Sequence, residues 1–323
     1  MSLDEMRNSP GLIIANPAAG TCGPELVTEL VARCRQFLPE VRVHWTTGRG
    51  DATDAARAAA EQSTGGPGIV FAVGGDGTVR EVVEGFTAAA RHPGRGPALM
   101  VVPAGTGNSN YLAHWNDCAW PTAVTAALSR LWNGPVTAEV RRLDLCRLVE
   151  TDEIVLLGAC SGLIAEALTH ARDVPLTGRP RYREALARAA EANRPYPGRV
   201  EVDGVLVHEG PTVLANVGGG RYRGGQYQVL PRSILDDGLL DVCVIGAETR
   251  AADVPELTRR AAHLGRPGVV YATGRRIVLS RQDGEPFWFE HDGELLPREH
   301  ATVTLEVLPG RLPVVCHAGR TLG

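Results

Sequence analysis

Two stretches of small and polar residues could bind the phosphates of a ligand. Gly74–Thr78 reads Gly-Gly-Asp-Gly-Thr after an apolar run, and Pro103–Asn108 follows a second apolar run. Glycines let the backbone approach a ligand closely, and the amides at the start of a helix favour anions. The carboxylate of Asp76 suits a magnesium ion that accompanies phosphate. Either stretch alone could instead be an ordinary turn.

A third polar stretch strengthens the phosphate interpretation. The apolar run Leu12–Ala15 leads into Asn16-Pro17-Ala18-Ala19-Gly20, much as the other two runs lead into their loops. The carboxyl ends of parallel strands share one edge of a sheet, and ligands bind at that edge. The sequence therefore predicts a nucleotide site there.

Strands and helices alternate through the first part of the chain. This alternation predicts an α/β domain over residues 1–135, with a Rossmann-like parallel sheet covered by helices. The expected strands are Leu12–Ala15, Val41–Thr46, Gly68–Val73 and Ala98–Val102, and the expected helices are Glu25–Phe37, 51–62 and Val79–Arg91.

The pattern changes near Gly134-Pro135, beyond which short strands dominate. We expect a β-rich domain of the sandwich type over residues 136–323, whose last strand could return toward the first domain. The expected strands are Val140–Val149, Ile154–Ala159, Arg199–Val207, Thr212–Asn216, Leu239–Ile245, Ile277–Ser280, Phe287–Glu290 and Ala301–Leu308. The expected helices are Ile164–Ala171, Tyr182–Asn193 and Pro255–His263.

The composition argues against several classes of protein. The net charge of −4 disfavours nucleic acid as a partner, and no apolar run reaches the roughly 20 residues of a membrane-spanning helix. The first residues lack the pattern of a signal peptide, and the seven cysteines form no C-x-x-C pair, so a cytoplasmic location is expected. All 33 basic residues are arginine, whereas a P-loop and a protein kinase each need a lysine.

Further motifs follow the polar loops in a fixed order. The whole series is Asn16-Pro17 with Gly20, Thr46 before Gly50-Asp51-Ala52, Gly74–Thr78 with Glu81-Val82-Val83, Pro103–Asn108, Gly224-Gly225, Pro231, Asp237-Gly238 and Asp292-Gly293-Glu294. The ordered set resembles the diacylglycerol kinase catalytic-domain family, in its soluble bacterial lipid-kinase branch, over nearly the whole chain. This resemblance implies a nucleotide domain and a β-sandwich domain with the active site between them.

The resemblance implies ATP binding by residues of the first domain. Asp76 would hold magnesium beside the ATP phosphates, and the amides of the surrounding glycines would bind those phosphates. A turn or helix-cap role is the alternative for each of these residues. The implied ATP-binding residues are Asn16, Thr46, Gly74, Gly75, Asp76, Gly77, Thr78, Gly105, Thr106 and Asn108.

The resemblance also places two acids, Asp292 and Glu294, at the site of phosphate transfer. A carboxylate in line with an acceptor hydroxyl could take its proton as the γ-phosphate arrives. The sequence does not distinguish which of the two acids is this base. A plain Asp-Gly hairpin turn is the alternative, and the same tripeptide at Asp283–Glu285 is expected to be such a turn.

Asp237 resembles the carboxylate ligand of a structural magnesium site in the family. The backbone carbonyls of Ile234 and Leu239 would complete that site, since oxygen ligands suit this ion, although a hairpin turn fits equally well. Asp144 could join the same network or be a surface strand residue. Four arginines could meet lipid head groups or simply lie on a solvated helix face. These are Arg179, Arg181, Arg183 and Arg188.

Three departures from the family pattern leave the substrate open. Ser109 stands where many relatives carry aspartate, and Gly158–Ile164 lacks the acid often found near its end. The Asn16-Pro17 loop lacks the basic residue that many members have.

The resemblance implies an ATP- and magnesium-dependent kinase of a lipid hydroxyl, most simply converting diacylglycerol to phosphatidate. Such an enzyme would dock transiently at a membrane surface as a peripheral protein. Two alternatives remain: an NAD kinase-like enzyme with a soluble acceptor, and a nucleotide-binding regulator without catalysis, motivated by Ser109. The sequence leaves a homodimer open.

Overall fold

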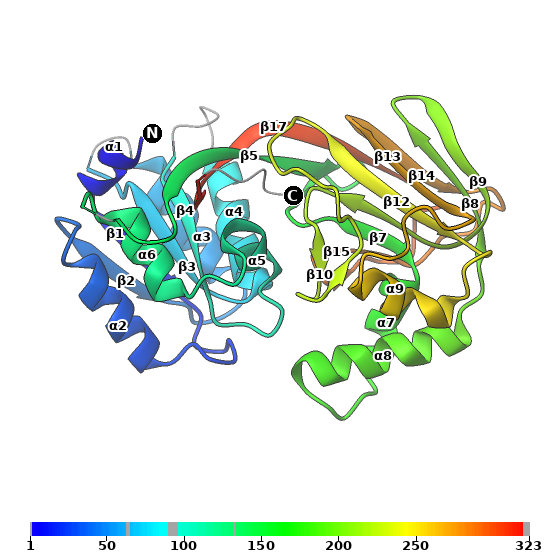
Figure 1. Ribbon diagram of the computed structural model, residues 1–323, viewed down its shortest axis with the longest axis horizontal. Helices are drawn as coiled ribbons and strands as arrows, with labels where there is room; N and C mark the ends of the chain where they lie inside the picture. The colour runs from blue at the N-terminus through cyan, green and yellow to red at the C-terminus, as the bar shows by residue number, and fades with distance from the viewer. Residues whose placement is uncertain (1, 63–64, 90–95, 132, 319–323) are drawn as a thin grey trace. The chain divides into compact units, whose positions relative to one another are not determined.

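The computed structural model describes residues 2–62, 65–89, 96–131 and 133–318 (Figure 1). The chain divides into two compact units. The first unit contains the chain up to Leu143 together with the segment from Gly310, and the second runs from Asp144 to Pro309. Two long strands, β5 (Ala138–Leu148) and β17 (Thr302–His317), therefore have residues in both units.

A parallel sheet forms the middle of the first unit. Its strands pair in the order β4-β3-β1-β2, and Val314 of β17 pairs in parallel with Leu99 of β4. Strand β3 is buried along its whole length, as expected for a central strand of valine, isoleucine and phenylalanine with both faces covered. The four strands are β1 (Gly11–Ala15), β2 (Val41–Trp45), β3 (Ile69–Gly74) and β4 (Ala98–Pro103).

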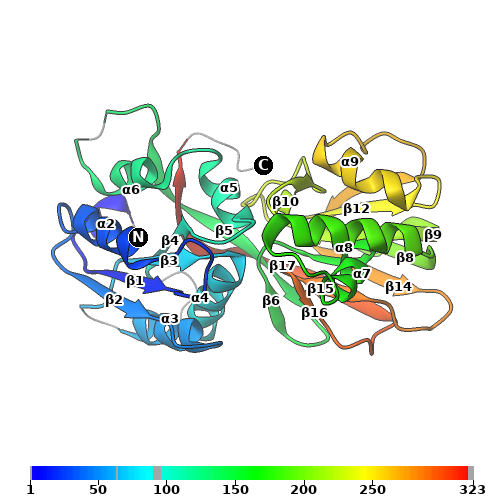
Figure 2. The ribbon, with the colours of Figure 1, turned by 90° about the horizontal axis from the view of Figure 1, so that it is seen from below.

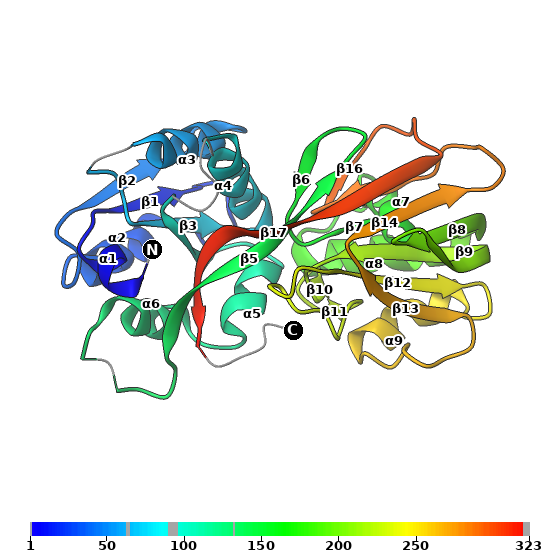
Figure 3. The same ribbon diagram turned by 90° about the horizontal axis from the view of Figure 1, so that it is seen from above.

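Helices cover both faces of this sheet. Figures 2 and 3 show α3 (Asp51–Glu61) and α4 (Asp76–Ala89) on one face, with α2 (Pro24–Cys34) and α6 (Trp120–Leu128) on the other. Helix α4 buries an apolar stripe at the spacing of a helical face, namely Val79, Val82, Val83 and Phe86. Two short helices complete the unit, α1 (Leu3–Arg7) and α5 (Ser109–Trp115).

The second unit is a β-sandwich-like arrangement of antiparallel strands. Valine, leucine and phenylalanine side chains from its strands form the inner core, and alternate residues of β8 are buried. Besides the ends of β5 and β17, its strands are β6 (Glu153–Val155), β7 (Ala159–Gly162), β8 (Tyr196–Val202), β9 (Val205–Gly218), β10 (Tyr222–Arg223), β11 (Tyr227–Gln228), β12 (Leu240–Gly246), β13 (Val269–Gly274), β14 (Arg276–Arg281), β15 (Phe289–His291) and β16 (Glu294–Leu295).

A second core lies between the strands and the helices of this unit. It joins Cys160, Leu214 and Cys243 of three neighbouring strands to Leu163 of α7 (Leu163–Ala171) and Leu186 of α8 (Gly178–Ala192). Figure 2 shows α7 and α8 beside the strands, with α9 (Val254–Arg259) nearby, which follows a single 3-10 turn at Ala251–Asp253.

Several expected elements differ from the structure. The strand expected over Arg199–Val207 is wrong, because Asp203 and Gly204 turn with φ of 49° and 82° between β8 and β9. Positive φ at both positions is typical of a two-residue hairpin turn. Strand β9 also absorbs the separate strand expected at Thr212–Asn216.

The strand expected over Ile154–Ala159 is also wrong, because β6 ends at Val155 and β7 begins at Ala159. Helices α1, α5 and α6 and strand β13 were not expected, although Pro121 in the first turn of α6 is a helix-start signal. The helix expected over Val79–Arg91 begins earlier, at Asp76, and its last two residues lie outside the described residues.

Candidate active-site elements in the two units

The loops that follow β1 and β3 contact each other in the first unit. The Asn16 amide donates to the Thr78 hydroxyl over 2.9 Å, and the Asn16 backbone amide donates to the Val73 carbonyl over 3.0 Å. A Cβ atom at Gly74 would lie within 3 Å of the Thr78 side chain, so glycine is required where the first turn of α4 folds back. Asn16 and Thr78, far apart in the sequence, are thus neighbours.

The loop after β4 packs on the same glycine-rich turn. A Cβ atom at Gly105 would collide with the Cα atom of Gly75, and the Ala104 amide donates to the Gly74 carbonyl over 2.9 Å. Asn108 has a left-handed backbone conformation. Its side chain closes the loop, because it accepts from the Gly105 amide and donates to the Gly105 carbonyl, both over 2.9 Å. Thr106 lies exposed within this closed loop.

The Asp76 carboxylate holds the start of α5. It accepts from the backbone amides of Ser109 and Asn110, each over 3.0 Å, and from the Asn110 side chain over 2.9 Å. The predicted metal-binding acid therefore also connects two of the three loops. Asn110 is not among the residues predicted from the sequence, although it lies only two positions after Asn108.

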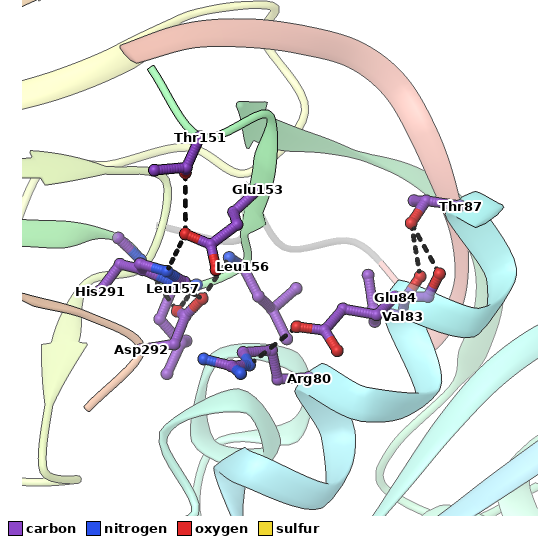
Figure 4. A network of polar contacts seen from close by, with 11 residues as sticks. Arg80, Val83, Glu84, Thr87, Thr151, Glu153, Leu156, Leu157, His291 and Asp292 are labelled. Carbon is purple, nitrogen blue, oxygen red and sulfur yellow. Dashed lines mark hydrogen bonds and ion pairs between the residues drawn. The ribbon is translucent and has the colours of Figure 1, made fainter. Parts of the chain in front are cut away.

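The remaining nucleotide candidates of the first unit lie beside this group or on the next strand. Thr46 follows β2, is 8% exposed, and donates its backbone amide to the Ala15 carbonyl over 2.9 Å. A Cβ atom at Gly77 would meet no atom within 4 Å. On α4, Figure 4 shows the ion pair between Arg80 and Glu84, 3.0 Å apart, and this pair belongs to the first unit alone.

Asp292 and Gly293 form the turn of a tight hairpin in the second unit. They connect β15 to β16 with φ of 49° and 86°, the signature of a two-residue turn with both central residues left-handed. Glu294 is the first residue of β16, is half-buried, and pairs across the hairpin with His291. The hairpin alternative is therefore correct for the backbone, which places Glu294 on a strand rather than in a mobile loop.

The Asp292 carboxylate is bound by the loop between β6 and β7. It accepts from the amides of Leu156 and Leu157 over 2.8 and 2.7 Å, and its side chain is 2% exposed (Figure 4). Burial raises the pKa of this carboxyl, but His291 and the two amides outweigh burial and leave the pKa below its ordinary value. Asp292 is thus held as a fixed carboxylate.

His291 extends this network to a second acid. Its Nδ1 lies 3.5 Å from the Asp292 carboxylate and its Nε2 lies 3.4 Å from the Glu153 carboxylate. Glu153 in turn accepts from the Thr151 hydroxyl over 2.8 Å (Figure 4). Nothing in the sequence pattern singled out Glu153 or His291, because their contacts bring together strands far apart in the chain.

A buried acid holds the other side of the turn. The Glu290 carboxylate accepts from the Gly293 amide over 2.9 Å, and burial raises the Glu290 pKa, opposed by the charge of Arg223. Arg223 is 6% exposed and donates to the Asn216 side chain over 2.9 Å. A Cβ atom at Gly158 would collide with the Arg223 guanidinium, so Arg223 supports the loop that binds Asp292.

The predicted structural magnesium residues lie on one loop of the second unit. The Asp144 amide donates to the Leu235 carbonyl over 2.7 Å, and the Asp144 carboxylate accepts from the Gly238 amide over 2.6 Å. Asp237 uses one oxygen to accept from the Leu239 amide over 3.0 Å, which leaves its other oxygen for a ligand. Carboxylate and carbonyl oxygens, such as those of Asp237, Ile234 and Leu239, are the type of ligand that magnesium prefers.

Among the described residues, no group of three or more His, Cys, Asp or Glu side chains is placed to hold a metal ion. Helices within the described ranges also include none that is both long and apolar enough to cross a bilayer.

Two family models match this chain in succession. The diacylglycerol kinase catalytic domain matches residues 10–148. The YegS C-terminal NAD kinase beta sandwich-like domain matches residues 158–316. The chain therefore carries a diacylglycerol kinase catalytic domain followed by a YegS-type C-terminal domain. It is accordingly a phosphotransferase with an alcohol group as acceptor, and the expected fold class, a parallel-sheet domain followed by a sandwich-type domain, is confirmed.

Curated relatives resemble the chain over nearly its whole length. "Probable lipid kinase YegS-like" of Enterobacter sp. (strain 638) is 26% identical over 92% of this chain and 94% of its own length. "Probable lipid kinase YegS" of Salmonella newport (strain SL254) is 27% identical over 96% of this chain and 99% of its own length.

Solved structures share the fold. A crystal structure of a diacylglycerol kinase from Bacillus anthracis str. Sterne aligns with a TM-score of 0.67 at 21% identity, over 96% of this chain and 97% of that chain. Another structure from the same organism aligns with a TM-score of 0.73 at 21% identity, over 97% and 99% of the two chains.

Proposed function

We propose that this protein transfers the γ-phosphate of ATP to a hydroxyl group of a lipid, most simply diacylglycerol, which gives phosphatidate. The observation that carries the proposal is the succession of the two matched domains over residues 10–148 and 158–316. Relatives named as lipid kinases over nearly the same length support it.

The first unit would bind the nucleotide. Its three loops combine glycine amides with the side chains of Asn16, Thr78 and Asn108, and Thr46 follows the neighbouring strand. Backbone amides and hydroxyls suit phosphate in a chain that lacks lysine. The contacts among these loops fix their donors before ATP arrives, which lowers the cost of ordering them on binding.

Asp76 is the residue that we assign to magnesium in the first unit. One of its oxygens accepts two hydrogen bonds and the other accepts one, so the second oxygen keeps an acceptor position. The donor set at Ile234, Asp237 and Leu239 is the proposed second site. Bound magnesium would neutralise phosphate charge during transfer.

Glu294 is the better candidate for the base that accepts the proton of the lipid hydroxyl. Asp292 has a lowered pKa and spends both oxygens on amides of the loop beside it, so it is a poor proton acceptor. Glu294 lies on β16, which pairs with β15, and the Glu290 carboxylate binds the Gly293 amide in the turn between these strands. The hydroxyl oxygen forms the new bond to phosphorus, its proton passes to Glu294, and the bond to ADP breaks.

We place this activity in the cytoplasm, with transient docking at a membrane surface where the lipid resides. A lipid acceptor requires such contact, and the phosphorylated product stays in the bilayer.

The test is transfer of label from γ-labelled ATP with magnesium to micelles of diacylglycerol, ceramide, sphingoid base, phosphatidylglycerol or prenol, with NAD as a soluble acceptor. We expect the unchanged protein to produce labelled lipid and the Asp76→Asn variant to produce none. The matched control Asp54→Asn changes an exposed acid on α3 and should keep activity. Labelled NAD, or ATP binding without any labelled lipid, would contradict the proposal.

A further inference from the structure

The second unit contains a pocket of about 250 Å³ that the proposed reaction does not use. It is lined by three arginines, Arg194, Arg281 and Arg298, which come from distant parts of the chain. Tyr196, Phe287 and Trp288 supply aromatic walls, and Glu166 of α7 supplies the one carboxyl group. At about 30 Å³ per water, the pocket has room for roughly eight waters or a small polar molecule.

The pocket and the Asp292 turn lie at opposite ends of the paired strands β7 and β15. At the pocket end, the Gly162 amide donates to the Trp288 carbonyl over 3.3 Å. At the turn end, the Asp292 amide donates to the Gly158 carbonyl over 3.0 Å. Asp292 follows Trp288 by four positions, and at about 3.3 Å per position the two places are roughly 13 Å apart.

Two of the arginines are held in place with donors to spare. Arg298 donates its Nε to the Pro286 carbonyl over 2.9 Å, and its guanidinium lies 5.3 Å from the centre of the Trp288 ring. Among the described residues, Arg194 donates only its Nη1, to the carbonyls of Ala192 and Asn193. The terminal Nη1 and Nη2 groups of Arg298 and the Nη2 group of Arg194 thus remain available for a ligand.

The charge of the third arginine, Arg281, is neutralised by an acid two residues away. Arg281 binds both oxygens of Asp283, over 2.9 and 2.6 Å, and lies 5.6 Å from the centre of the Tyr196 ring. Glu285 acts on Arg281 as a further negative charge. The charge balance of the pocket is therefore set mainly by Arg194 and Arg298 against Glu166.

Glu166 adds a hydrogen-bonding group beside the arginines. One of its oxygens accepts from the Asn193 side chain over 3.0 Å. Burial raises the pKa of Glu166, against the lowering effects of Asn193, His170, Arg298 and Arg281. The other carboxyl oxygen can bind a hydroxyl group of a ligand.

We propose that this pocket binds a phosphate ester of a small polyol, of which glycerol phosphate is the simplest example. Two guanidinium groups with free N–H donors match the oxygens of a phosphate, Glu166 matches a polyol hydroxyl, and the aromatic walls cover the carbon backbone. The same group occurs free in solution and as the head group of phosphatidylglycerol. This proposal does not depend on the proposed kinase activity.

The test is a titration of the full chain with glycerol 3-phosphate, followed by the indole N–H signals of its five tryptophans in NMR spectra. Trp288→Phe identifies the signal beside the pocket, and glycerol serves as the uncharged control ligand. We expect a saturable shift of the Trp288 signal with the phosphate ester and none with glycerol. Arg298→Ala and Arg194→Ala should each weaken binding at least about tenfold, the usual scale of a lost hydrogen bond to a charged group.

The matched control is Arg250→Ala, an exposed arginine of the second unit that pairs with Asp253 and does not line the pocket. It should bind like the unchanged protein, and circular dichroism should show all variants folded. Vesicles of phosphatidylglycerol, compared with phosphatidylcholine, separate the two sources: binding to vesicles alone supports the lipid head group, and binding of the free ester supports a soluble ligand. No saturable shift with either probe, or equal binding by Arg298→Ala and Arg250→Ala, would overturn the proposal.

Discussion

The tripeptide Asp-Gly-Glu occurs twice in the second unit, and its two copies have different surroundings. The Asp292 side chain is 2% exposed and accepts from the backbone amides of Leu156, Leu157 and Gly158. The Asp283 side chain is 37% exposed and pairs with Arg281. Both copies turn the chain, since Gly284 and Gly293 have φ of 73° and 86°.

The difference shows that a turn sequence and a functional site do not exclude each other. Asp283 meets one side chain two residues away, so its surroundings are local. Asp292 meets a loop 135 residues away, and the neighbouring Gly293 amide is bound by a buried acid. Long-range support fixes the position of Glu294 after the turn, and Glu285 has no such support.

Gly158→Ala should have the largest effect on this support. The added Cβ atom would collide with the Arg223 guanidinium and with the Val217 carbonyl oxygen, at a position whose φ is 145°. We expect the free energy of unfolding to fall by about 2–5 kcal/mol, from crowding and backbone strain together. Urea unfolding followed by tryptophan fluorescence measures it.

The matched change is Gly284→Ala, where a Cβ atom would meet nothing within 4 Å. Backbone strain alone should cost about 1–2 kcal/mol there. Equal losses at the two glycines would show that Arg223 does not support the loop.

Asp292→Asn should have the next largest effect. An amide group in place of a carboxylate oxygen would point a donor at the amide of Leu156 or Leu157. We expect a loss of about 1–3 kcal/mol in the free energy of unfolding, the cost of a buried donor without an acceptor. Asp283→Asn should change stability little because the side chain is solvated, and a loss at Asp283 as large as at Asp292 would contradict the comparison.

The smallest expected effect is on the pH dependence of the free energy of unfolding, which should differ between the unchanged protein and Asp292→Asn. The pKa of Asp292 is lower in the folded state than its unfolded value of about 3.9. The ionised carboxylate therefore stabilises the folded state fully above the unfolded pKa, and this stabilisation is lost as the pH falls through the folded pKa. Below about pH 4, the free energy of unfolding should therefore fall more steeply for the unchanged protein than for Asp292→Asn. Parallel pH curves from urea unfolding would show that Asp292 is not held as a carboxylate.

Much of the fold could be predicted because its determinants are local. The valine-rich strands and the glycine loops of the first unit carry their own periodicity and turn signals. The hairpin at Asp203-Gly204 has the same Asp-Gly signal as the two tripeptides, but the β-branched residues on both sides predict one continuous strand. The break between β6 and β7 could not be predicted, because Leu156 and Leu157 leave the sheet to bind Asp292.

The candidate site could be predicted only where its residues form a contiguous motif. The loops around Asp76 and Asn108 were recognisable, and their contacts follow from the parallel sheet. Glu153 could not be found, because its contact with His291 joins strands that are distant in the chain. Arg223 and Glu290 could not be found either, because the charge of one acts on the other across a long stretch of sequence. In the proposed mechanism, Glu294 is favoured over Asp292 as the base because the amides of Leu156 and Leu157 bind the Asp292 carboxylate.

The most direct test of this account is the rate of phosphate transfer from γ-labelled ATP to lipid by Glu294→Gln beside Glu285→Gln, with folding and ATP affinity measured for both. The account predicts that Glu294→Gln folds, binds ATP as before and transfers phosphate about 100–10,000-fold more slowly, the usual contribution of a general base. Glu285→Gln should transfer at the unchanged rate. An unchanged rate in Glu294→Gln, or equal losses in both variants, would contradict the account.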